Sequence, residues 1–180
     1  MKVMFYRANS KFYYGDFEGA IKDYEKLLFI KDFENQIFYN MAKSQLINLN
    51  YQDAINNYNK LIEYDQNDSS AYLDRGNAKF KINDYLGSIE DYGNSIALNN
   101  KSYISLNNRG VSKFKLKKYK SALEDFKKSL KINAYNYNTF FNKSLTHFKL
   151  NEIKKACIDL KKSMNLGKEV FEDEYKKICI

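Results

Sequence analysis

Proline and tryptophan are absent from this 180-residue chain, and glycine occurs only seven times. Because proline and glycine interrupt regular structure, their scarcity argues against loop-rich and collagen-like folds and favours helices. The chain has one histidine, His147, so no histidine pair can hold a metal, and it has no glycine-rich phosphate-binding loop. We therefore expect no catalytic residue, no cofactor and no metal ion, and predict that the chain is not an enzyme.

Cysteines and long apolar runs are also scarce. Cys157 and Cys179 are the only cysteines, too few for a disulfide framework or a zinc site. No segment approaches the roughly 18 consecutive apolar residues that a membrane span needs. The N-terminus meets Arg7 and Asn9 before a signal-peptide core could form. These absences predict a cytoplasmic protein without a membrane span.

What the chain does have is self-similarity at a constant spacing of 34 residues. Five copies follow one another without insertions, at 1–34, 35–68, 69–102, 103–136 and 137–168, and Met1 is taken as repeat position 1. Apolar residues recur at positions 17, 20, 21, 24 and 28, the stripe of an amphipathic helix. Positions 15 and 16 are mostly turn formers or helix caps. Each repeat is therefore predicted to be a helix A, a tight turn and a helix B.

Two columns of small residues predict that the two helices approach closely. Position 8 contains Ala8, Ala42, Gly76, Gly110 and Ser144. Position 20 contains Ala20, Ala54, Ser88, Ala122 and Ala156. Position 21 is isoleucine in the first three repeats and Cys157 in the fifth, so we interpret Cys157 as a small core residue.

A third pair of columns predicts an ion pair between the helices. Position 7 is basic in every repeat except the second, and position 23 is aspartate in the same four repeats. In repeat two both charges are missing, because Met41 and Asn57 occupy the columns. We predict an A-to-B ion pair in each charged repeat, of the exposed kind that contributes about 0.2–1 kcal/mol. His147, at position 11, is interpreted as a packing residue.

These columns resemble the tetratricopeptide repeat, best in the copy that contains Gly76, Tyr85 and Tyr92. The resemblance covers residues 1 to about 168, although the family's tryptophan at position 4 and tyrosine at position 11 are missing. It implies an all-α, right-handed solenoid of five helix-turn-helix repeats. Apolar residues in 169–180 predict a capping helix that completes a single domain over 1–180.

In this family helix A lines a concave groove, chiefly through positions 2, 5, 6 and 9 and parts of 12 and 13. Asparagine offers both a donor and an acceptor, so it can pair with a peptide unit of an extended ligand, and apolar neighbours can receive its side chains. The family's basic clamp for chaperone C-termini is not expected, because its cationic positions hold no lysine or arginine here. The abundance of asparagine in this chain is the competing explanation. The predicted groove residues are Phe5, Asn9, Tyr39, Asn40, Lys43, Leu73, Asp74, Asn77, Asn107, Asn108, Phe141 and Asn142.

Charge is spread unevenly along the chain. Residues 103–168 carry 16 basic and 4 acidic side chains, whereas residues 1–68 carry 8 basic and 10 acidic ones. Many of the lysines of repeats four and five are expected on helix B. Such a face can attract nucleic acid or an anionic surface. The preference for lysine over arginine favours a solvated, solubilising face instead.

The predicted function is a protein–protein interaction scaffold or adaptor that binds a peptide or helix of another protein in the groove. The basic end is expected to select acidic partners, and no small-molecule substrate is expected. The alternative is binding of nucleic acid or an anionic surface through the lysine-rich face of repeats four and five. A third hypothesis places the first repeat against another subunit, and the oligomeric state is left open.

Overall fold

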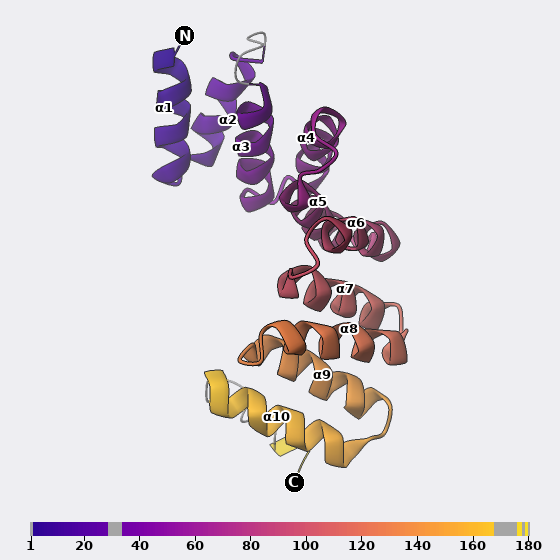
Figure 1. Ribbon diagram of the computed structural model, residues 1–180. Helices are drawn as coiled ribbons and strands as arrows, with labels where there is room; N and C mark the ends of the chain where they lie inside the picture. The colour runs from indigo at the N-terminus through magenta and orange to yellow at the C-terminus, as the bar shows by residue number, and fades with distance from the viewer. Residues whose placement is uncertain (1, 29–33, 168–175, 178, 180) are drawn as a thin grey trace. The chain divides into compact units, whose positions relative to one another are not determined.

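The computed structural model describes residues 2–28, 34–167, 176, 177 and 179, and in this part of the chain it contains ten α-helices and no strand (Figure 1). The all-α class is thereby confirmed. The helices are α1 (Lys2–Tyr13), α2 (Phe17–Glu25), α3 (Glu34–Ile47), α4 (Tyr51–Tyr64), α5 (Ser69–Lys81), α6 (Tyr85–Leu98), α7 (Tyr103–Lys115), α8 (Tyr119–Ile132), α9 (Tyr137–Lys149) and α10 (Ile153–Gly167). The capping helix predicted at 169–180 lies largely outside the described residues. None of the described helices is long and apolar enough to cross a membrane.

Consecutive helices pack as hairpins, α1 with α2, α3 with α4, α5 with α6, α7 with α8 and α9 with α10. The first helix of each hairpin is called the A helix below and the second the B helix. The chain divides into two compact units. Unit 1 spans residues 1–98 with α1–α6, and unit 2 spans residues 99–180 with α7–α10; each unit is described by itself.

The turn inside each hairpin has the same backbone geometry in all five repeats. The residue at position 15 has a positive φ, between 59° and 83°, whether it is Gly15, Leu49 or Lys117. The next N–H then donates to the carbonyl at position 11, as from Asp16 to Lys11 at 2.9 Å. This is the bond that closes a helix C-terminus when a left-handed residue follows it. The turn therefore reverses the chain after a fixed number of residues, even where no glycine is present.

The hairpin cores are built on a large side chain of the B helix that lies against a small residue of the A helix. Position 24 is fully buried in every repeat and is Tyr, Tyr, Tyr, Phe and Leu in order. A Cβ added at Gly110 would lie 2.6 Å from Cε1 of Phe126, and one added at Gly76 would lie 2.8 Å from Cε1 of Tyr92. The predicted close approach of the two helices is confirmed by these contacts.

A buried aspartate of the B helix ties each charged hairpin together. The four predicted ion pairs are confirmed, with N–O distances of 2.6–2.9 Å: Arg7–Asp23, Arg75–Asp91, Arg109–Asp125 and Lys143–Asp159. The expectation that they are exposed is wrong for the aspartates, whose side chains are only 1–5% exposed, whereas the Arg7 side chain of the first pair is 54% exposed. Removing one partner of a buried pair leaves an uncompensated charge, so these pairs matter far more than surface ones.

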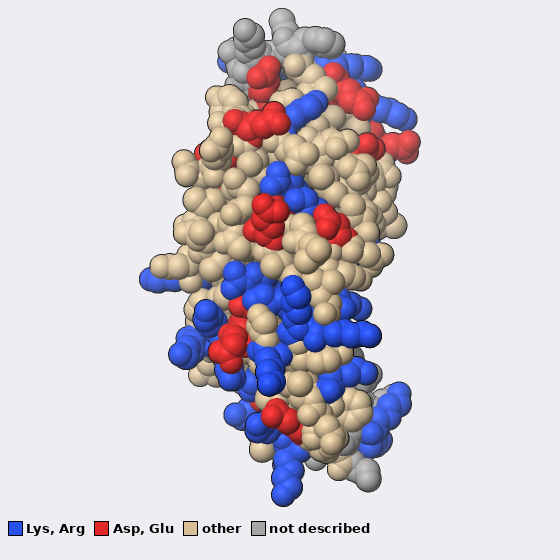
Figure 2. All heavy atoms as spheres, turned by 90° about the vertical axis from the view of Figure 1, so that its right-hand side faces the viewer, with Lys and Arg blue, Asp and Glu red and all other residues tan. Residues whose placement is uncertain are grey.

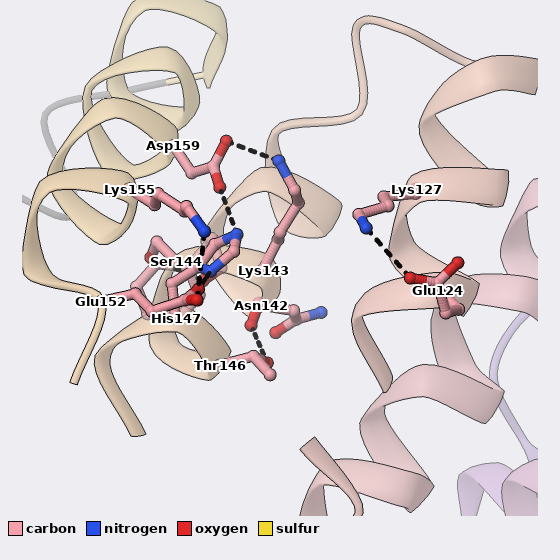
Figure 3. A network of polar contacts seen from close by, with 11 residues as sticks. Glu124, Lys127, Asn142, Lys143, Ser144, Thr146, His147, Glu152, Lys155 and Asp159 are labelled. Atoms are coloured by element: carbon pink, nitrogen blue, oxygen red, sulfur yellow. Dashed lines mark hydrogen bonds and ion pairs between the residues drawn. The ribbon is translucent and has the colours of Figure 1, made fainter. Parts of the chain in front are cut away.

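Each buried aspartate also receives a second basic group, which comes from position 11. The distances are 2.9 Å for Lys11–Asp23, 2.9 Å for Lys79–Asp91, 2.6 Å for Lys113–Asp125 and 3.5 Å for His147–Asp159. Figure 3 shows the fifth repeat, in which Lys143 and His147 both point toward Asp159 while Glu152 and Lys155 lie on the other side of the imidazole. Repeat two replaces the charges with a buried amide pair, in which Asn57 donates to Gln45 at 2.7 Å.

Acid is expected to weaken the first of these networks. The hydrogen bond from Arg7 lowers the pKa of Asp23 from 3.8 to about 2, against the opposing effect of burial. Because the folded pKa lies below the unfolded one, the contribution is complete above about pH 4 and is lost as the pH falls toward 2. A carboxyl ¹³C NMR titration is expected to give Asp23 a midpoint near pH 2. The lowered pKa stabilises the folded protein by at most about 2 kcal/mol. A midpoint near 4 would contradict the buried pair.

Candidate functional site

In unit 1 the predicted groove asparagines contact one another across repeats. The side-chain amide of Asn40 donates to Oδ1 of Asn9 at 3.0 Å, so the A helices α1 and α3 are linked. The hydroxyl of Tyr24 donates to the same Oδ1 at 2.5 Å, and Asn40 also donates to that hydroxyl at 3.1 Å. Burial raises the pKa of Tyr24 to about 12, so the hydroxyl stays protonated and remains a donor.

Position 9 therefore has a structural role that the groove prediction did not include. In the third repeat Tyr92 likewise donates its hydroxyl to Oδ1 of Asn77, at 2.9 Å. Where position 24 carries no hydroxyl, as at Phe126 and Leu160, position 9 is the apolar Val111 or Leu145. The repeat columns could have revealed this hydrogen bond, because asparagine at position 9 occurs only together with tyrosine at position 24.

The second repeat breaks this pairing. Tyr58 is fully buried, and position 9 of its repeat is Lys43. Among the described residues the Tyr58 hydroxyl finds no hydrogen-bond partner, and burial raises its pKa. Lys43 instead forms an ion pair with Asp74 at 3.4 Å and lies over the ring of Tyr39, 5.3 Å from its centroid. Three predicted groove residues thus form one cluster on α3 and α5.

Phenylalanine at position 58 is expected to stabilise the protein. A buried hydroxyl without a partner costs about 1–3 kcal/mol, so Tyr58→Phe should raise the free energy of unfolding by about 1 kcal/mol. The matched change Tyr92→Phe removes the bond to Asn77 and should lower the free energy of unfolding by about as much. Urea unfolding of both variants gives the comparison. Equal losses for both variants would contradict the assignment of Tyr58 as unsatisfied.

Asp74 is the carboxylate of this cluster. Burial raises its pKa, whereas the Lys43 ammonium opposes the shift, and Asn77 donates to its Oδ1 at 3.4 Å. A half-buried carboxylate beside a lysine can accept hydrogen bonds from a partner's backbone or side chains. Two of the predicted apolar groove residues differ in their exposure. Phe5 is a core residue with 6% of its surface exposed, whereas Leu73 is half-buried. Phe5 therefore offers a ligand little surface.

Unit 2 brings its own groove residues together. Oδ1 of Asn107 accepts bonds from Asn142 Nδ2 and Thr139 Oγ1, both at 3.1 Å, which links α7 to α9. The amide of Asn107 in turn donates to Oδ1 of Asn108 at 3.1 Å. Phe141, the remaining predicted residue, is half-buried on α9. The A helices of this unit thus present a connected set of amides.

Beside these amides lies a pocket of about 100 Å³ that the sequence pattern did not reveal. Its lining comes from α7, α8 and α9: Val111, Phe114, Phe126, Asn142 and Leu145. Only the Asn142 side chain among them is polar. Since position 9 is aliphatic in both hairpins of unit 2, the space beside Phe126 has no amide to fill it.

Many of the lysines of repeats four and five lie on the B helices α8 and α10, as expected, and are exposed there. On the face that Figure 2 shows, Lys and Arg side chains crowd the part formed by α7–α10, whereas the part formed by α1–α6 carries both acidic and basic side chains. Among residues 99–167, each of the four carboxylates has a basic partner: Asp125, Asp159, Glu124 with Lys127, and Glu152 with Lys155. Most of the lysines within residues 99–167 therefore have no carboxylate partner among the described residues.

The interpretation of Cys157 as a core residue is wrong. Its side chain is half-buried, and it forms a disulfide with Cys179, with a Cα–Cα distance of 5.6 Å. This bond attaches the C-terminal end of the chain to α10. His147 is buried as expected, but as a member of the Asp159 network. Within the described residues no three His, Cys, Asp or Glu side chains are placed to hold a metal ion.

Paired helices repeated at a fixed spacing define an α-helical repeat solenoid, and comparison with known proteins identifies its kind. The family model described as the tetratricopeptide repeat matches residues 103–136. The chain thus has the fold of a tetratricopeptide repeat protein, as its repeat columns predicted. A search of curated protein sequences finds no match.

Two solved structures of the same fold cover nearly the whole chain, and a third covers part of it. A crystal structure of MamA has a TM-score of 0.84 at 22% identity, over 94% of this chain and 96% of that one. YrrB, described as a tetratricopeptide repeat protein with an unusual peptide-binding site, has a TM-score of 0.81 at 16% identity, over 97% and 90%. The first such domain of Spaghetti (RPAP3), bound to an HSP90 peptide, has a TM-score of 0.59 at 23% identity, over 61% and 89%. This fold is typical of scaffolds for protein interaction.

Proposed function

We propose that this chain is a non-catalytic scaffold or adaptor that binds a peptide or helical segment of another protein on the faces of its A helices. The observation that carries the proposal is the linkage of groove side chains across neighbouring A helices, Asn9 with Asn40 in unit 1 and Asn107 with Asn142 in unit 2. An amide held in place by its neighbour loses less conformational freedom when a ligand binds. Peptide binding by two proteins of the same fold supports the same reading.

The test is capture of a partner from a nuclease-treated lysate at moderate and at high salt. Asn9 and Asn77, which accept the hydrogen bonds of the buried Tyr24 and Tyr92 hydroxyls, are left unchanged so that the variant folds. The groove variant replaces three amides of A helices with alanine: Asn40, Asn108 and Asn142. The matched control replaces three exposed amides of B helices: Asn56, Asn94 and Asn165. We expect a defined protein that survives high salt on the wild type and the control and is lost on the groove variant.

The alternative function is binding of nucleic acid or an anionic surface through the lysine-rich face of repeats four and five. Neutralising several phosphates makes affinity fall steeply with ionic strength, whereas an amide and apolar surface tolerates salt. Binders that vanish with nuclease or salt, and that ignore the groove changes, would favour the alternative and contradict our proposal.

A cytoplasmic location is part of the proposal, and the Cys157–Cys179 disulfide is its direct test. Structural disulfides persist in oxidising compartments and are rare in the cytosol. Trapping of thiols in intact host cells should find both cysteines free if the protein works in the cytoplasm. A bridged form in cells would refute the location and leave the binding proposal standing.

A further inference from the structure

We propose that the pocket of unit 2 receives one aliphatic side chain from a short acidic segment of the partner protein. This inference rests on the proposed function and specifies the chemistry of the ligand at that site. The lining of the pocket is apolar on α7 and α8 and mostly apolar on α9. Val111 and Leu145 occupy the position that carries asparagine in repeats one and three. An unfilled apolar space on a binding face is where a ligand gains free energy by burying a side chain.

The size of the pocket favours an aliphatic side chain over a ring. It has a volume of about 100 Å³. This volume suits one aliphatic side chain such as Leu, Ile, Val or Met and is smaller than the roughly 150 Å³ cavity that holds benzene. The ring of Phe126 forms the floor and is fully buried, so a ligand side chain ends against a fixed surface.

One polar group at the pocket is placed to orient the ligand's main chain. Nδ2 of Asn142 donates to Asn107, which holds the amide in position. The carbonyl oxygen Oδ1 of the same amide takes no part in that bond. An oriented acceptor beside an apolar pocket suits a backbone N–H adjacent to the inserted side chain.

Charge complementarity identifies the flanking residues of the ligand as acidic. Lys115 follows Val111 by four residues on α7, and Lys149 follows Leu145 by four on α9, so each lysine lies on the same helix face as a pocket residue. Both lysines are exposed, and neither has an ion-pair partner in the described part of the chain. All four carboxylates of residues 99–167 are already engaged by basic groups. Asp or Glu beside the inserted side chain would supply the missing counter-charges.

The probe is a capped pentapeptide, acetyl-Asp-Glu-Leu-Glu-Asp-amide, titrated into the full-length protein while the methyl NMR signals of Val111 and Leu145 are followed. We expect saturable shifts at these methyls. Replacing the peptide leucine with alanine should weaken binding about tenfold, because one leucine side chain is no longer buried. Replacing its acidic residues with lysine should abolish the shifts, since the flanks would then repel Lys115 and Lys149.

Two protein variants separate the pocket from its charged rim. Val111→Phe fills the pocket, and Ile158→Phe adds the same ring at an exposed site of α10 as the control. Lys115→Glu with Lys149→Glu reverses the rim charges without altering the core. Its control makes the same charge change on α8, with Lys128→Glu and Lys131→Glu. Both pocket variants should weaken the peptide at least about fivefold relative to their controls, with unchanged helix content and melting temperature.

The results that overturn the inference differ from those that overturn the proposed function. Equal binding of the leucine and alanine peptides, shifts confined to the lysines of α8 and α10, or no shift up to about 5 mM peptide would each remove the pocket as a side-chain site. Capture of a partner that still depends on Asn40, Asn108 and Asn142 would then leave the scaffold function intact. Loss of that dependence would remove the scaffold function itself.

Discussion

Replacement of Asp91 with alanine should lower the free energy of unfolding of unit 1 by about 3–5 kcal/mol, the range for breaking a buried ion pair from one side. The Asp91 carboxylate is 1% exposed and receives Arg75 at 2.6 Å and Lys79 at 2.9 Å. Without it two cations that are 15% and 19% exposed lose their counter-charge. Arg75 keeps its bond to Asn59, at 2.9 Å, and its position over the ring of Tyr72, 5.4 Å from the centroid. Chemical denaturation followed by circular dichroism measures the loss.

The second repeat supplies the control for this experiment. It fills the same three positions with Met41, Gln45 and Asn57, which bury no charge. The triple variant Arg75→Met, Lys79→Gln and Asp91→Asn should therefore recover most of the stability that Asp91→Ala loses. A loss below about 1 kcal/mol for Asp91→Ala, or a triple variant that is equally unstable, would show that the network is not a coupled buried unit.

Replacement of Phe126 with alanine should lower the free energy of unfolding of unit 2 by about 3–5 kcal/mol, the usual range for emptying a buried aromatic site. The ring is fully buried and lies so close to α7 that a Cβ at Gly110 would be 2.6 Å from it. Alanine leaves a cavity that the glycine opposite cannot fill. Urea unfolding of the full chain, followed at the signals of unit 2, provides the measurement.

The fifth repeat shows how the Phe126 site can be repacked. There a serine, Ser144, faces the smaller Leu160. Phe126→Leu alone should cost about 1–2 kcal/mol, and adding Gly110→Ser should restore part of it by filling the gap. If the added serine destabilises the protein further, the two positions do not pack as a pair.

Much of the fold was predictable because the sequence contains five copies of one helical hairpin. Position 7 and position 23 change together, so the ion pairs between the helices could be inferred from Arg75 and Asp91 without a structure. Small residues at positions 8 and 20 predicted the close approach of the two helices in the same way. The five repeats can be aligned with one another and compared column by column, because each hairpin packs on its neighbours under the same constraints.

The burial of the aspartates was not predictable from those columns. Lysine, glutamine and histidine at position 11 look like an exposed polar column, yet Lys79 and its equivalents point inward at the aspartate. Long side chains reach across a hairpin in a direction that sequence spacing does not specify. Burial in turn changes the energetic weight of the pair, from a surface contact to a core one.

Only part of the geometry of the candidate site could be predicted from the sequence. Asparagines of neighbouring A helices do meet, at Asn9 with Asn40 and at Asn107 with Asn142. Phe5 was assigned to the groove because apolar residues look alike in a pattern, whether they face a ligand or the core. The pocket beside Phe126 was missed because empty volume has no sequence signature. The Cys157–Cys179 bond was missed because the column of Cys157 otherwise holds apolar residues.

Site-specific photo-crosslinking tests most directly whether the A helices form the binding face. A benzophenone amino acid is placed at position 2 of two A helices, Gln36 and Ile104, and at two exposed positions of B helices, Leu86 and Ile158. The account predicts that Gln36 or Ile104 crosslinks one defined protein in cells and that the Leu86 and Ile158 probes do not. Crosslinks to that protein from Leu86 or Ile158 alone, or none above background at the A-helix positions, would contradict it.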